Sequence, residues 1–261
     1  KPQNYGGSTG GLTTLREGLR KSLNLISVRI VQQDYAPAEQ VKRTAQRMGI
    51  STDIRAVDAI ALGTSEVIPL EMVSAYAAYA NKGVYSKPFA ITKIEDRYGN
   101  TIREYGAVQY EVLSEEIAFL MTNLMQTVMD RGTAGSARWK YKFTRPAAGK
   151  TGTTQGWSDA WFVGFTPQLA AGVWFGVDDY QVSLGVGQDG SKAALPTWAK
   201  FMRDGHDILE MPRVNFQRPS GVIVSEICSV SKMGARKACP VEKEVYKSGS
   251  EPGQKCRIHR N

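Results

Sequence analysis

Cysteine is scarce in this sequence, and none occurs before residue 228. The three that are present, Cys228, Cys239 and Cys256, all lie near the C-terminal end. A main body without thiols suits an exported protein with a cross-linked tail. In an oxidising compartment one pair could form a disulfide and leave one thiol over, and the sequence leaves the pairing open. In a reducing compartment all three would be reduced and buried.

Histidine is rarer still. His206 and His259 stand far apart in the sequence, and neither lies in an H-E-x-x-H or C-x-x-C spacing. We therefore expect no metal site, no other cofactor and no Ser-His-Asp relay.

Long apolar runs are also missing. No stretch approaches the roughly 18–20 apolar residues that a transmembrane helix needs. No signal peptide opens the sequence, which starts at Lys1 without an initiator Met. We expect any membrane anchor or export signal to lie upstream of this chain.

Acidic residues are outnumbered, since 25 Asp and Glu face 33 Lys and Arg and give a formal net charge of +8. Such a balance can favour nucleic acid, an anionic membrane surface or a polyanionic cell wall. The sequence has, however, no Arg-rich helix, zinc-finger spacing or aromatic RNA-binding stripe. We interpret the charge as a solvated basic surface and expect no nucleic-acid binding.

What the sequence does have is enough apolar material, 42% of its residues, for one sizeable core with a small appendage. Apolar side chains at spacings of three and four predict helices. The expected helical segments are two within residues 13–32, separated by a turn at residues 22–24, and one each at residues 37–48, 69–81, 114–130 and 195–204.

Strands are expected where the apolar period changes to two. An exposed hairpin is predicted at residues 89–105, around a turn at residues 98–100. Three further strands are predicted at residues 145–153, 159–165 and 168–177, and the short connection between the last two makes them antiparallel.

The order of these elements bears on the fold and on domain organisation. Helices, then antiparallel strands, then one more helix indicate a mixed α/β fold with segregated elements. We assign residues 1–205 to one domain and residues 206–261 to a small basic tail. Within the tail only residues 221–227 resemble a strand.

The most informative segment is Lys150-Thr151-Gly152-Thr153, on the first of the three expected strands. It places a cation, two hydroxyls and one backbone position without a side chain on an extended chain. Such a strand can pair with an extended peptide through main-chain hydrogen bonds, while the charged and hydroxyl groups hold a carboxylate. A glycine within a strand often marks close approach by a ligand or another backbone. Alone, however, K-T-G is too short to be informative.

A second short motif, Ser22-Leu23-Asn24, matches Ser-x-Asn and precedes K-T-G in the chain. Together the two resemble the second and third signature motifs of the serine penicillin-binding proteins and β-lactamases. The blocks KPQNYGG, LTTLREGLRKSLN, ALGTSEVIPLEMVSAYAAYANKG, RGTAG, GKTGTT and DAWFVGFTP resemble successive blocks of class A penicillin-binding proteins, especially the 1A kind. This resemblance covers residues 1–203. The tail resembles, more weakly, a C-terminal extension of some members.

The resemblance implies a penicillin-binding protein and serine β-lactamase-like transpeptidase fold, with an antiparallel sheet flanked by helices and incomplete at its N-terminal side. It implies that the chain is part of the D,D-transpeptidase domain of a bifunctional cell-wall synthase. Such a domain cross-links peptidoglycan stem peptides through a serine acyl-enzyme and is acylated by β-lactam antibiotics. Its place would be the outer face of the bacterial cytoplasmic membrane, with a glycosyltransferase domain and a membrane anchor upstream.

The resemblance also implies roles for single residues. Ser22 would relay a proton toward the leaving amine, and Lys150 would supply positive potential and orient the substrate. Asn24 would hold a substrate amide, and the hydroxyls of Thr151 and Thr153 would bind its carboxylate. The N–H of Thr153 would be one donor of an oxyanion hole. The residues expected to bind substrate are therefore Asn24, Thr151, Gly152 and Thr153.

One motif of the family has no suitable counterpart. The Ser-x-x-Lys of this chain, Ser229 to Lys232, lies in the tail, after the other motifs and outside any strong helical pattern. We interpret it as a coincidental match. In the family the nucleophilic serine begins a helix, with its lysine one turn on to accept the hydroxyl proton. We therefore expect the nucleophile upstream of Lys1 and expect this chain alone to be inactive.

Two alternatives remain open. A β-lactamase or D,D-carboxypeptidase would use the same motifs with water as acceptor, although the block pattern and the tail argue against it. A wall-binding or regulatory module would keep the groove without the serine. Trp157, Trp161 and Trp174 could line such a groove, but large aromatic residues in adjacent strands are more often core, and we expect them there.

Overall fold

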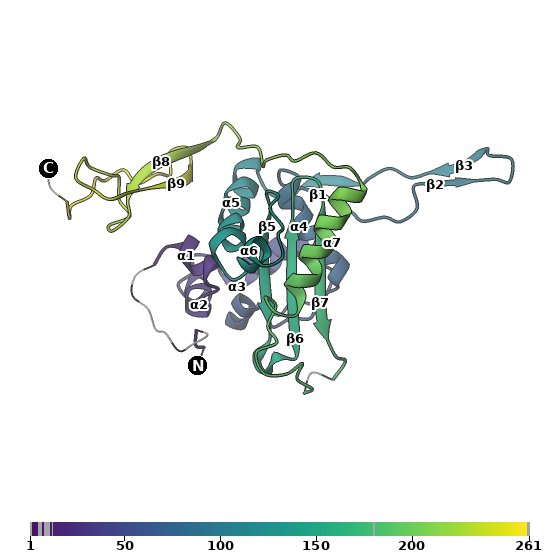
Figure 1. Cartoon of the computed structure of the whole chain (residues 1–261), viewed down its shortest axis with the longest axis horizontal. Helices are drawn as coiled ribbons and strands as arrows, with labels where there is room; N and C mark the ends of the chain where they lie inside the picture. Colours follow the sequence, from purple (N-terminus) through teal and green to yellow (C-terminus); the bar gives the residue numbers. More distant parts are fainter. Residues whose placement is uncertain (1, 5–6, 8–10, 12, 180, 260–261) are drawn as a thin grey trace.

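A three-stranded antiparallel sheet forms the centre of the molecule (Figure 1). The structure is a computed structural model that describes residues 2–4, 7, 11, 13–179 and 181–259. The strands are β5 (Ala148–Thr153), β6 (Asp159–Phe165) and β7 (Ala170–Gly176), in that spatial order. All three were expected from the sequence, and their antiparallel pairing is confirmed. Within the described residues β5 is an edge strand, with β6 as its strand neighbour.

Helices cover both faces of this sheet. Alternate residues of β6 point to opposite sides, so β6 presents apolar side chains to both faces. On one face the ring of Phe162 lies 4.8 Å from that of Trp198, in α7 (Ala194–Ile208). On the other face Phe165 stacks on Tyr79 of α4 (Pro69–Ala80), with ring centroids 6.3 Å apart. The mixed α/β fold expected from the sequence is therefore observed.

A group of helices lies beside the β5 edge (Figure 1). The long helix α5 (Glu115–Arg131) packs against β5 and begins with a cap in which Ser114 accepts a hydrogen bond from the backbone of Ile117. The helix and its start at Ser114 were expected from the sequence. The other members of the group are α1 (Leu15–Arg20), α2 (Asn24–Gln32), α3 (Ala38–Arg47) and α6 (Ser136–Trp139).

Short elements connect the helices. The hairpin of β2 (Lys93–Glu95) and β3 (Thr101–Glu104) projects from the body, and every residue of both strands is exposed, as expected (Figure 1). The pairing of β1 (Val84–Ser86) with β4 (Gln109–Glu111) was not predicted. These strands have three residues each and carry too few side chains to show a period. Two short 3-10 helices are η1 (Asp58–Leu62), between α3 and α4, and η2 (Gln155–Trp157), between β5 and β6.

The tail forms a separate antiparallel ribbon of β8 (Val222–Cys228) and β9 (Val241–Lys247). The strand β8 was expected, whereas β9, whose sequence VEKEVYK is largely charged, was not. The helix α7 continues to Ile208, past the boundary expected at residue 205.

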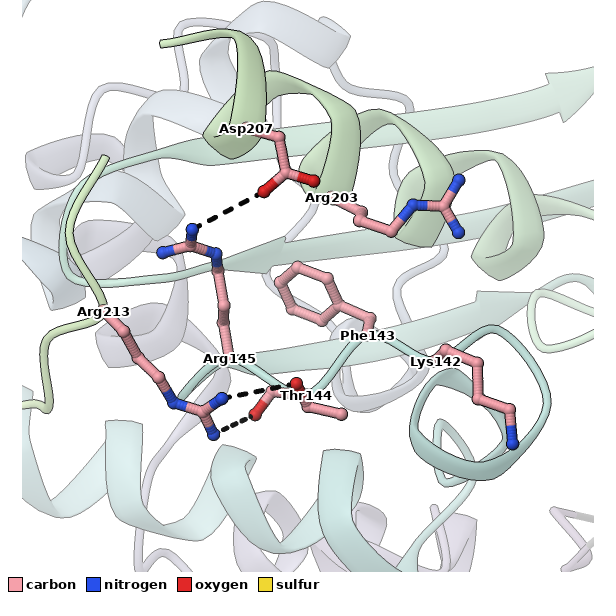
Figure 2. A pocket seen from close by; sticks show the side chains of 7 residues that line it. All are labelled: Lys142, Phe143, Thr144, Arg145, Arg203, Asp207 and Arg213. Carbon is pink, nitrogen blue, oxygen red and sulfur yellow. Dashed lines mark hydrogen bonds and ion pairs between the residues drawn. The ribbon is translucent and has the colours of Figure 1, made fainter. Parts of the chain in front are cut away.

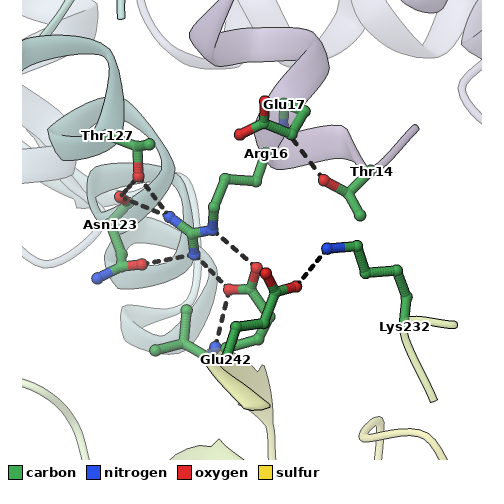
Figure 3. Close-up of polar contacts among 9 residues, drawn as sticks. Thr14, Arg16, Glu17, Asn123, Thr127, Lys232 and Glu242 are labelled. Carbon is green, nitrogen blue, oxygen red and sulfur yellow. Dashed lines mark hydrogen bonds and ion pairs between the residues drawn. The ribbon is translucent and has the colours of Figure 1, made fainter. Parts of the chain in front are cut away.

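Arg16 of α1 connects the ribbon to the body (Figure 3). Its Nε donates to Glu244 Oε2 at 2.7 Å, and its Nη2 forms a short ion pair with the same carboxylate. The guanidinium also donates to the Thr127 hydroxyl at 2.6 Å and to the Asn123 amide oxygen at 2.7 Å, both on α5. One arginine therefore joins α1, α5 and β9.

The expectation for three tryptophans was wrong. Trp157, Trp161 and Trp174 are partly exposed rather than core, and Trp174 is 42% exposed. The rings of Trp161 and Trp174 lie 6.1 Å apart as a cross-strand pair. Trp161 shares a sheet face with Phe165, but α4 packs over the Phe165 end. The buried tryptophan is Trp198. Among the described residues, no helix is both long and apolar enough to cross a membrane.

Candidate functional site

Ser22 lies in the tight turn between α1 and α2, where the apolar spacing predicted a turn. Its backbone is in the left-handed region, with φ of 54°. The turn is closed by two hydrogen bonds, from the N–H of Ser22 to Leu19 O at 3.1 Å and from that of Leu23 to Gly18 O at 2.8 Å. A non-glycine residue in this region is strained by crowding of its Cβ, and such strain concentrates at functional sites.

Lys150 reaches this turn from the edge strand β5. Its Nζ donates to Ser22 Oγ at 2.7 Å and to the carbonyl oxygen of Thr151 at 2.9 Å. Burial of the ammonium group lowers the pKa of Lys150 to about 8. Two motifs that lie 128 residues apart in the sequence therefore meet at one hydrogen bond.

This pair can hold a proton or pass one on. At neutral pH an amine with a pKa near 8 is still mostly protonated, but it releases its proton far more readily than an exposed lysine. The Ser22 hydroxyl accepts a hydrogen bond from the ammonium and keeps its own O–H free to rotate toward a third group.

Thr151 contacts a residue that the sequence did not single out. Its hydroxyl lies 2.9 Å from that of Thr133, within the RGTAG block that follows α5. The N–H of Thr133 donates to Arg20 O at 3.3 Å, at the end of α1. At Gly132 a Cβ would lie 2.6 Å from the same carbonyl, so only glycine allows this approach. The block was recognised from the resemblance, but only the fold shows that it links α1 to β5.

Thr153 stands exposed at the end of β5 and is held from the other side. Its hydroxyl accepts a hydrogen bond from the N–H of Gly190 at 3.1 Å. A side chain at position 190 would put a Cβ 2.2 Å from Trp161 O and 2.7 Å from Gly152 O. The segment before α7 therefore lies directly against the end of β5. The Cβ of Trp161 would come within 3.1 Å of a Cβ added to Gly152.

Asn24 is the first residue of α2 and lies two positions after Ser22. Its Nδ2 donates to the carbonyl oxygen of Gln3 at 2.9 Å. This bond uses one of the two N–H donors of the side-chain amide, so the second donor and the amide oxygen are left for a substrate. The structure thus brings Ser22 and Lys150 together directly, and shows Asn24 engaged with the N-terminal segment.

Ser229 and Lys232 form no comparable pair. They lie in the turn after β8 rather than at the start of a helix. The Lys232 ammonium donates to Glu242 Oε1 at 2.6 Å, across the ribbon (Figure 3). A lysine held in an ion pair is a poor acceptor for a serine proton, in keeping with a coincidental match.

A surface hollow away from Ser22 and Lys150 is lined mostly by basic residues (Figure 2). Two of its arginines are engaged in hydrogen bonds within the protein. Its residues are Lys142, Phe143, Thr144, Arg145, Arg203, Asp207 and Arg213. Arg145 donates to Met211 O at 2.9 Å, and Arg213 donates to Thr144 O at 2.7 Å. These arginines fix the segment after α7 to the segment before β5, and Ser22 and Lys150 do not line this hollow.

The cysteines of the tail lie together. Cys228, Cys239 and Cys256 are buried free thiols, and their sulfur atoms lie with a ring nitrogen of His259 inside a cluster no wider than 4.8 Å. We had expected no metal site, because neither histidine stands in the two spacings considered. The spacing C-x-x-H of Cys256 and His259 was the signal that could have indicated a ligand pair.

Comparisons with known proteins identify the family of the chain. Residues 1–203 match the family described as the penicillin binding protein transpeptidase domain. The chain is 35% identical over 256 residues to penicillin-binding protein 1A of Aquifex aeolicus, covering 98% of this chain and 34% of that protein. It is 32% identical over 262 residues to penicillin-binding protein 2D of Bacillus subtilis, covering 98% of this chain and 37% of the relative. The chain thus spans about a third of the length of these relatives.

Solved structures show the same fold. The crystal structure of penicillin-binding protein 1A from Haemophilus influenzae matches with a TM-score of 0.88 at 26% identity, over 98% of this chain and 43% of that one. The PonA1 protein of Mycobacterium tuberculosis, solved in complex with penicillin V, matches with a TM-score of 0.68 at 25% identity, over 83% of this chain and 61% of that one. This chain therefore belongs to the penicillin-binding protein transpeptidase family and carries a 1A-like transpeptidase domain over most of its length.

Proposed function

We propose that this chain provides the proton-transfer and substrate-binding parts of a peptidoglycan D,D-transpeptidase site. The observation that carries the proposal is the 2.7 Å hydrogen bond between Lys150 Nζ and Ser22 Oγ, beside an edge strand. Family membership supports the reaction class, and the relative PonA1 was solved with penicillin V.

In the proposed reaction a serine supplied by a Ser-x-x-Lys segment outside residues 1–261 attacks the carbonyl carbon of a donor peptide ending in D-Ala-D-Ala, and the lysine of that segment takes the serine's proton. The C–N bond breaks, and the leaving amine takes a proton from the Ser22 hydroxyl. Ser22 takes a replacement proton from the Lys150 ammonium. An amine of a neighbouring stem peptide then attacks the acyl-enzyme and the ester C–O bond breaks. The serine recovers its proton from the lysine of its own segment, and the proton lost by the attacking amine returns through Ser22 to Lys150. General acid catalysis of this kind contributes on the order of 10²–10⁴-fold in rate.

Substrate would bind along β5. An extended peptide can pair with the exposed edge of this strand through its main chain. We assign the hydroxyls of Thr151 and Thr153 to the terminal carboxylate, which the Lys150 charge also attracts. The N–H of Thr153 would donate to the oxyanion, and removing one such donor typically costs about 10²–10³-fold in rate. Asn24 would bind a backbone amide through the donor and the oxygen that its contact with Gln3 leaves free.

The rest of the protein would complete the enzyme. We propose that a glycosyltransferase domain and a membrane anchor precede this chain, and that the site works at the outer face of the bacterial cytoplasmic membrane. β-Lactams would acylate the same serine as mimics of the donor peptide. Residues 206–261 would form a separate C-terminal extension.

The test is the rate of labelling of the full-length protein by a fluorescent penicillin. Lys150→Ala should lower the second-order acylation rate constant by about 10²-fold or more, while the melting temperature stays within a few degrees. Lys200→Ala serves as the matched control, because Lys200 is exposed on α7, away from β5. An unchanged acylation rate in Lys150→Ala would overturn the proposal. The absence of an adduct in the unaltered protein would favour a non-catalytic wall-binding module. An adduct that is rapidly hydrolysed would favour a β-lactamase or carboxypeptidase.

A further inference from the structure

Four residues of the C-terminal tail converge although none belongs to the transpeptidase motifs. The sulfur atoms of Cys228, Cys239 and Cys256 and one ring nitrogen of His259 all lie within 4.8 Å of one another. Nδ1 of His259 lies 3.4 Å from the sulfur of Cys228 and 3.4 Å from that of Cys256. The three cysteines are buried, and none forms a disulfide. Three thiols and one imidazole at this separation are a complete ligand set for one metal ion.

The spacing fits a tetrahedral metal ion better than it fits a disulfide. Zn²⁺ bonds of about 2.3 Å to sulfur and about 2.0 Å to nitrogen give tetrahedron edges of about 3.6 Å between sulfur and nitrogen and about 3.8 Å between two sulfurs. The two distances of 3.4 Å between His259 Nδ1 and the sulfurs of Cys228 and Cys256 are close to the first value. A disulfide would draw two sulfurs to about 2.0 Å and leave the third thiol and the imidazole beside it without a role.

Backbone groups orient the sulfurs. The N–H of Ser231 donates to the sulfur of Cys228 at 3.5 Å, and the N–H of His259 donates to that of Cys256 at 3.5 Å. The N–H of Arg236 donates to the sulfur of Cys239 at 3.2 Å. Each thiol therefore already has an amide donor, the arrangement that stabilises negative charge on a metal-bound sulfur.

The segments that carry the ligands are also held to one another. The N–H of Cys256 donates to Gly234 O at 2.8 Å, and the N–H of Gly234 donates to Gln254 O at 3.0 Å. The Nε of Arg236 donates to the carbonyl oxygen of Cys256 at 2.7 Å. The last ligand pair is thereby fixed against the loop between β8 and β9.

Apart from the Arg16 contact and the buried Val222 and Ile227 of β8, the interior of the tail is small. The buried cluster around the thiols consists of the three cysteines, with Ala235 packed against it. A unit of this size cannot bury enough apolar surface to offset the conformational entropy lost on folding. Small domains of this kind commonly depend on disulfides or a structural metal. Here the three buried cysteines form a large share of the interior of the tail, beside Val222 and Ile227.

We propose that Cys228, Cys239, Cys256 and His259 bind one Zn²⁺ as a closed, tetrahedral, structural site. Binding releases one proton from each of the three thiols, and neutral His259 contributes the lone pair of Nδ1, so the bound site carries a net charge of −1. Three thiolates and one imidazole favour Zn²⁺ over Mg²⁺ or Ca²⁺, which take oxygen ligands. The four positions are filled by protein, so the ion would hold the fold rather than perform chemistry.

The site is independent of the transpeptidase proposal, since it shares none of its residues. Its test begins with the full chain, purified under reducing conditions without chelator, by elemental analysis for metals. We expect about one Zn²⁺ per chain. The chain stripped of metal should bind added Co²⁺ with sulfur-to-cobalt charge-transfer absorption and the strong visible bands of tetrahedral Co²⁺. Adding Zn²⁺ should protect the tail from trypsin.

Variants assign the ligands. Cys256→Ser and His259→Ala should each lower the affinity for Zn²⁺ by more than the roughly 10–100-fold expected for loss of a supporting contact alone. His259→Cys should retain the ion, because four thiolates also form a closed site. Lys237→Ala, an exposed change in the same loop, should leave metal content unaltered.

Three results would overturn the proposal. One is a chain that holds no stoichiometric metal and gives no tetrahedral Co²⁺ spectrum. Another is a native disulfide between two of the three cysteines, seen as a single titratable thiol under denaturing conditions. The last is an unchanged Zn²⁺ affinity in both Cys256→Ser and His259→Ala.

Discussion

Ser22 presents its hydroxyl to Lys150 from a backbone conformation that a β-carbon disfavours. With φ at 54°, the residue pays about 1–2 kcal/mol relative to glycine. A glycine would relieve this strain and close the turn equally well. The serine is therefore best explained by what its hydroxyl does, since it accepts the Lys150 hydrogen bond.

Replacing Ser22 by glycine or by alanine tests the hydroxyl and the backbone strain separately. In the full-length protein, Ser22→Gly and Ser22→Ala should both lower the penicillin acylation rate constant by about 10²-fold or more, since both remove the relay hydroxyl. Ser22→Gly should melt at or above the temperature of Ser22→Ala, because only glycine accepts the left-handed conformation freely. Acylation of Ser22→Gly at the unaltered rate would show that the hydroxyl has no part in the reaction.

The pKa of Lys150, lowered by burial to about 8, predicts a pH dependence. If the ammonium is the proton donor, the acylation rate constant should fall about tenfold per pH unit above pH 8. Lys150→Arg stays charged throughout and should be slower but flat over that range. A rate that rises through pH 8 would contradict the role of Lys150 as donor.

The same pKa predicts how stability changes with pH. The folded pKa lies below the ordinary value of 10.5, so the unfolded chain binds the proton more tightly. The cost of burying the ammonium is therefore present below pH 8 and is relieved between pH 8 and 10.5. Relative to Lys150→Ala, the unaltered chain should gain stability over this range in denaturant titrations.

At the scale of elements, one side chain of α7 contacts two strands of the sheet at once. Trp198 is fully buried, its ring packs on Phe143 and Phe162, and its Nε1 donates to Gly164 O and Ala171 O. The two carbonyls belong to β6 and β7, so a single indole spans the helix and both strands.

Trp198→Ala should lower the free energy of unfolding by about 3–5 kcal/mol, because it leaves a cavity and removes two hydrogen bonds. Trp139→Ala in α6 is the matched control, since Trp139 is 68% exposed and should cost under about 0.5 kcal/mol. Denaturant titration of both variants measures the difference. Equal losses would contradict the placement of α7.

The elements that sequence analysis predicted are those with enough length to show a period. The helices α4, α5 and α7 and the strands β5 to β7 are of this kind, and the turn at Ser22 was predicted from the apolar spacing on either side of it. The strand β9 was missed because its partner β8 and the thiol cluster, rather than its own apolar residues, hold it in place. The C-x-x-H spacing of Cys256 and His259 was readable in the sequence but was not considered, and only the fold of the ribbon shows that Cys228 and Cys239 lie beside this pair.

At the scale of the whole molecule, the tail joins the body through Arg16. The side chains of Arg16 and Glu244 are 12% and 16% exposed, so this ion pair is mostly shielded from water. Burial raises the pKa of Glu244, but the hydrogen bonds from Arg16 and from the N–H of Val245 outweigh it, and the net pKa is lowered. The stabilisation is thus present above the ordinary pKa of 4.5 and is lost as the pH falls through the folded value.

Arg16→Ala should lower the free energy of unfolding by about 3 kcal/mol at pH 7, because it leaves a shielded carboxylate without its partner. Arg43→Ala removes an exposed pair with Glu39 and should cost under about 1 kcal/mol. The loss in Arg16→Ala should shrink as the pH falls below 4.5, because Glu244 is then protonated first in the unfolded chain and, at lower pH, in the folded chain. A loss that is the same at pH 7 and pH 3.5 would contradict this account of the joint.

The most direct measurement is a crystal structure of the full-length protein acylated by a penicillin. We expect the drug to lie along β5, with its carboxylate within about 3.2 Å of the hydroxyl of Thr151 or Thr153. Its ring nitrogen should face Ser22. The contradicting result is a drug that is bound to the serine but lies away from Ser22 and Lys150, with the hydrogen bond between Ser22 and Lys150 undisturbed.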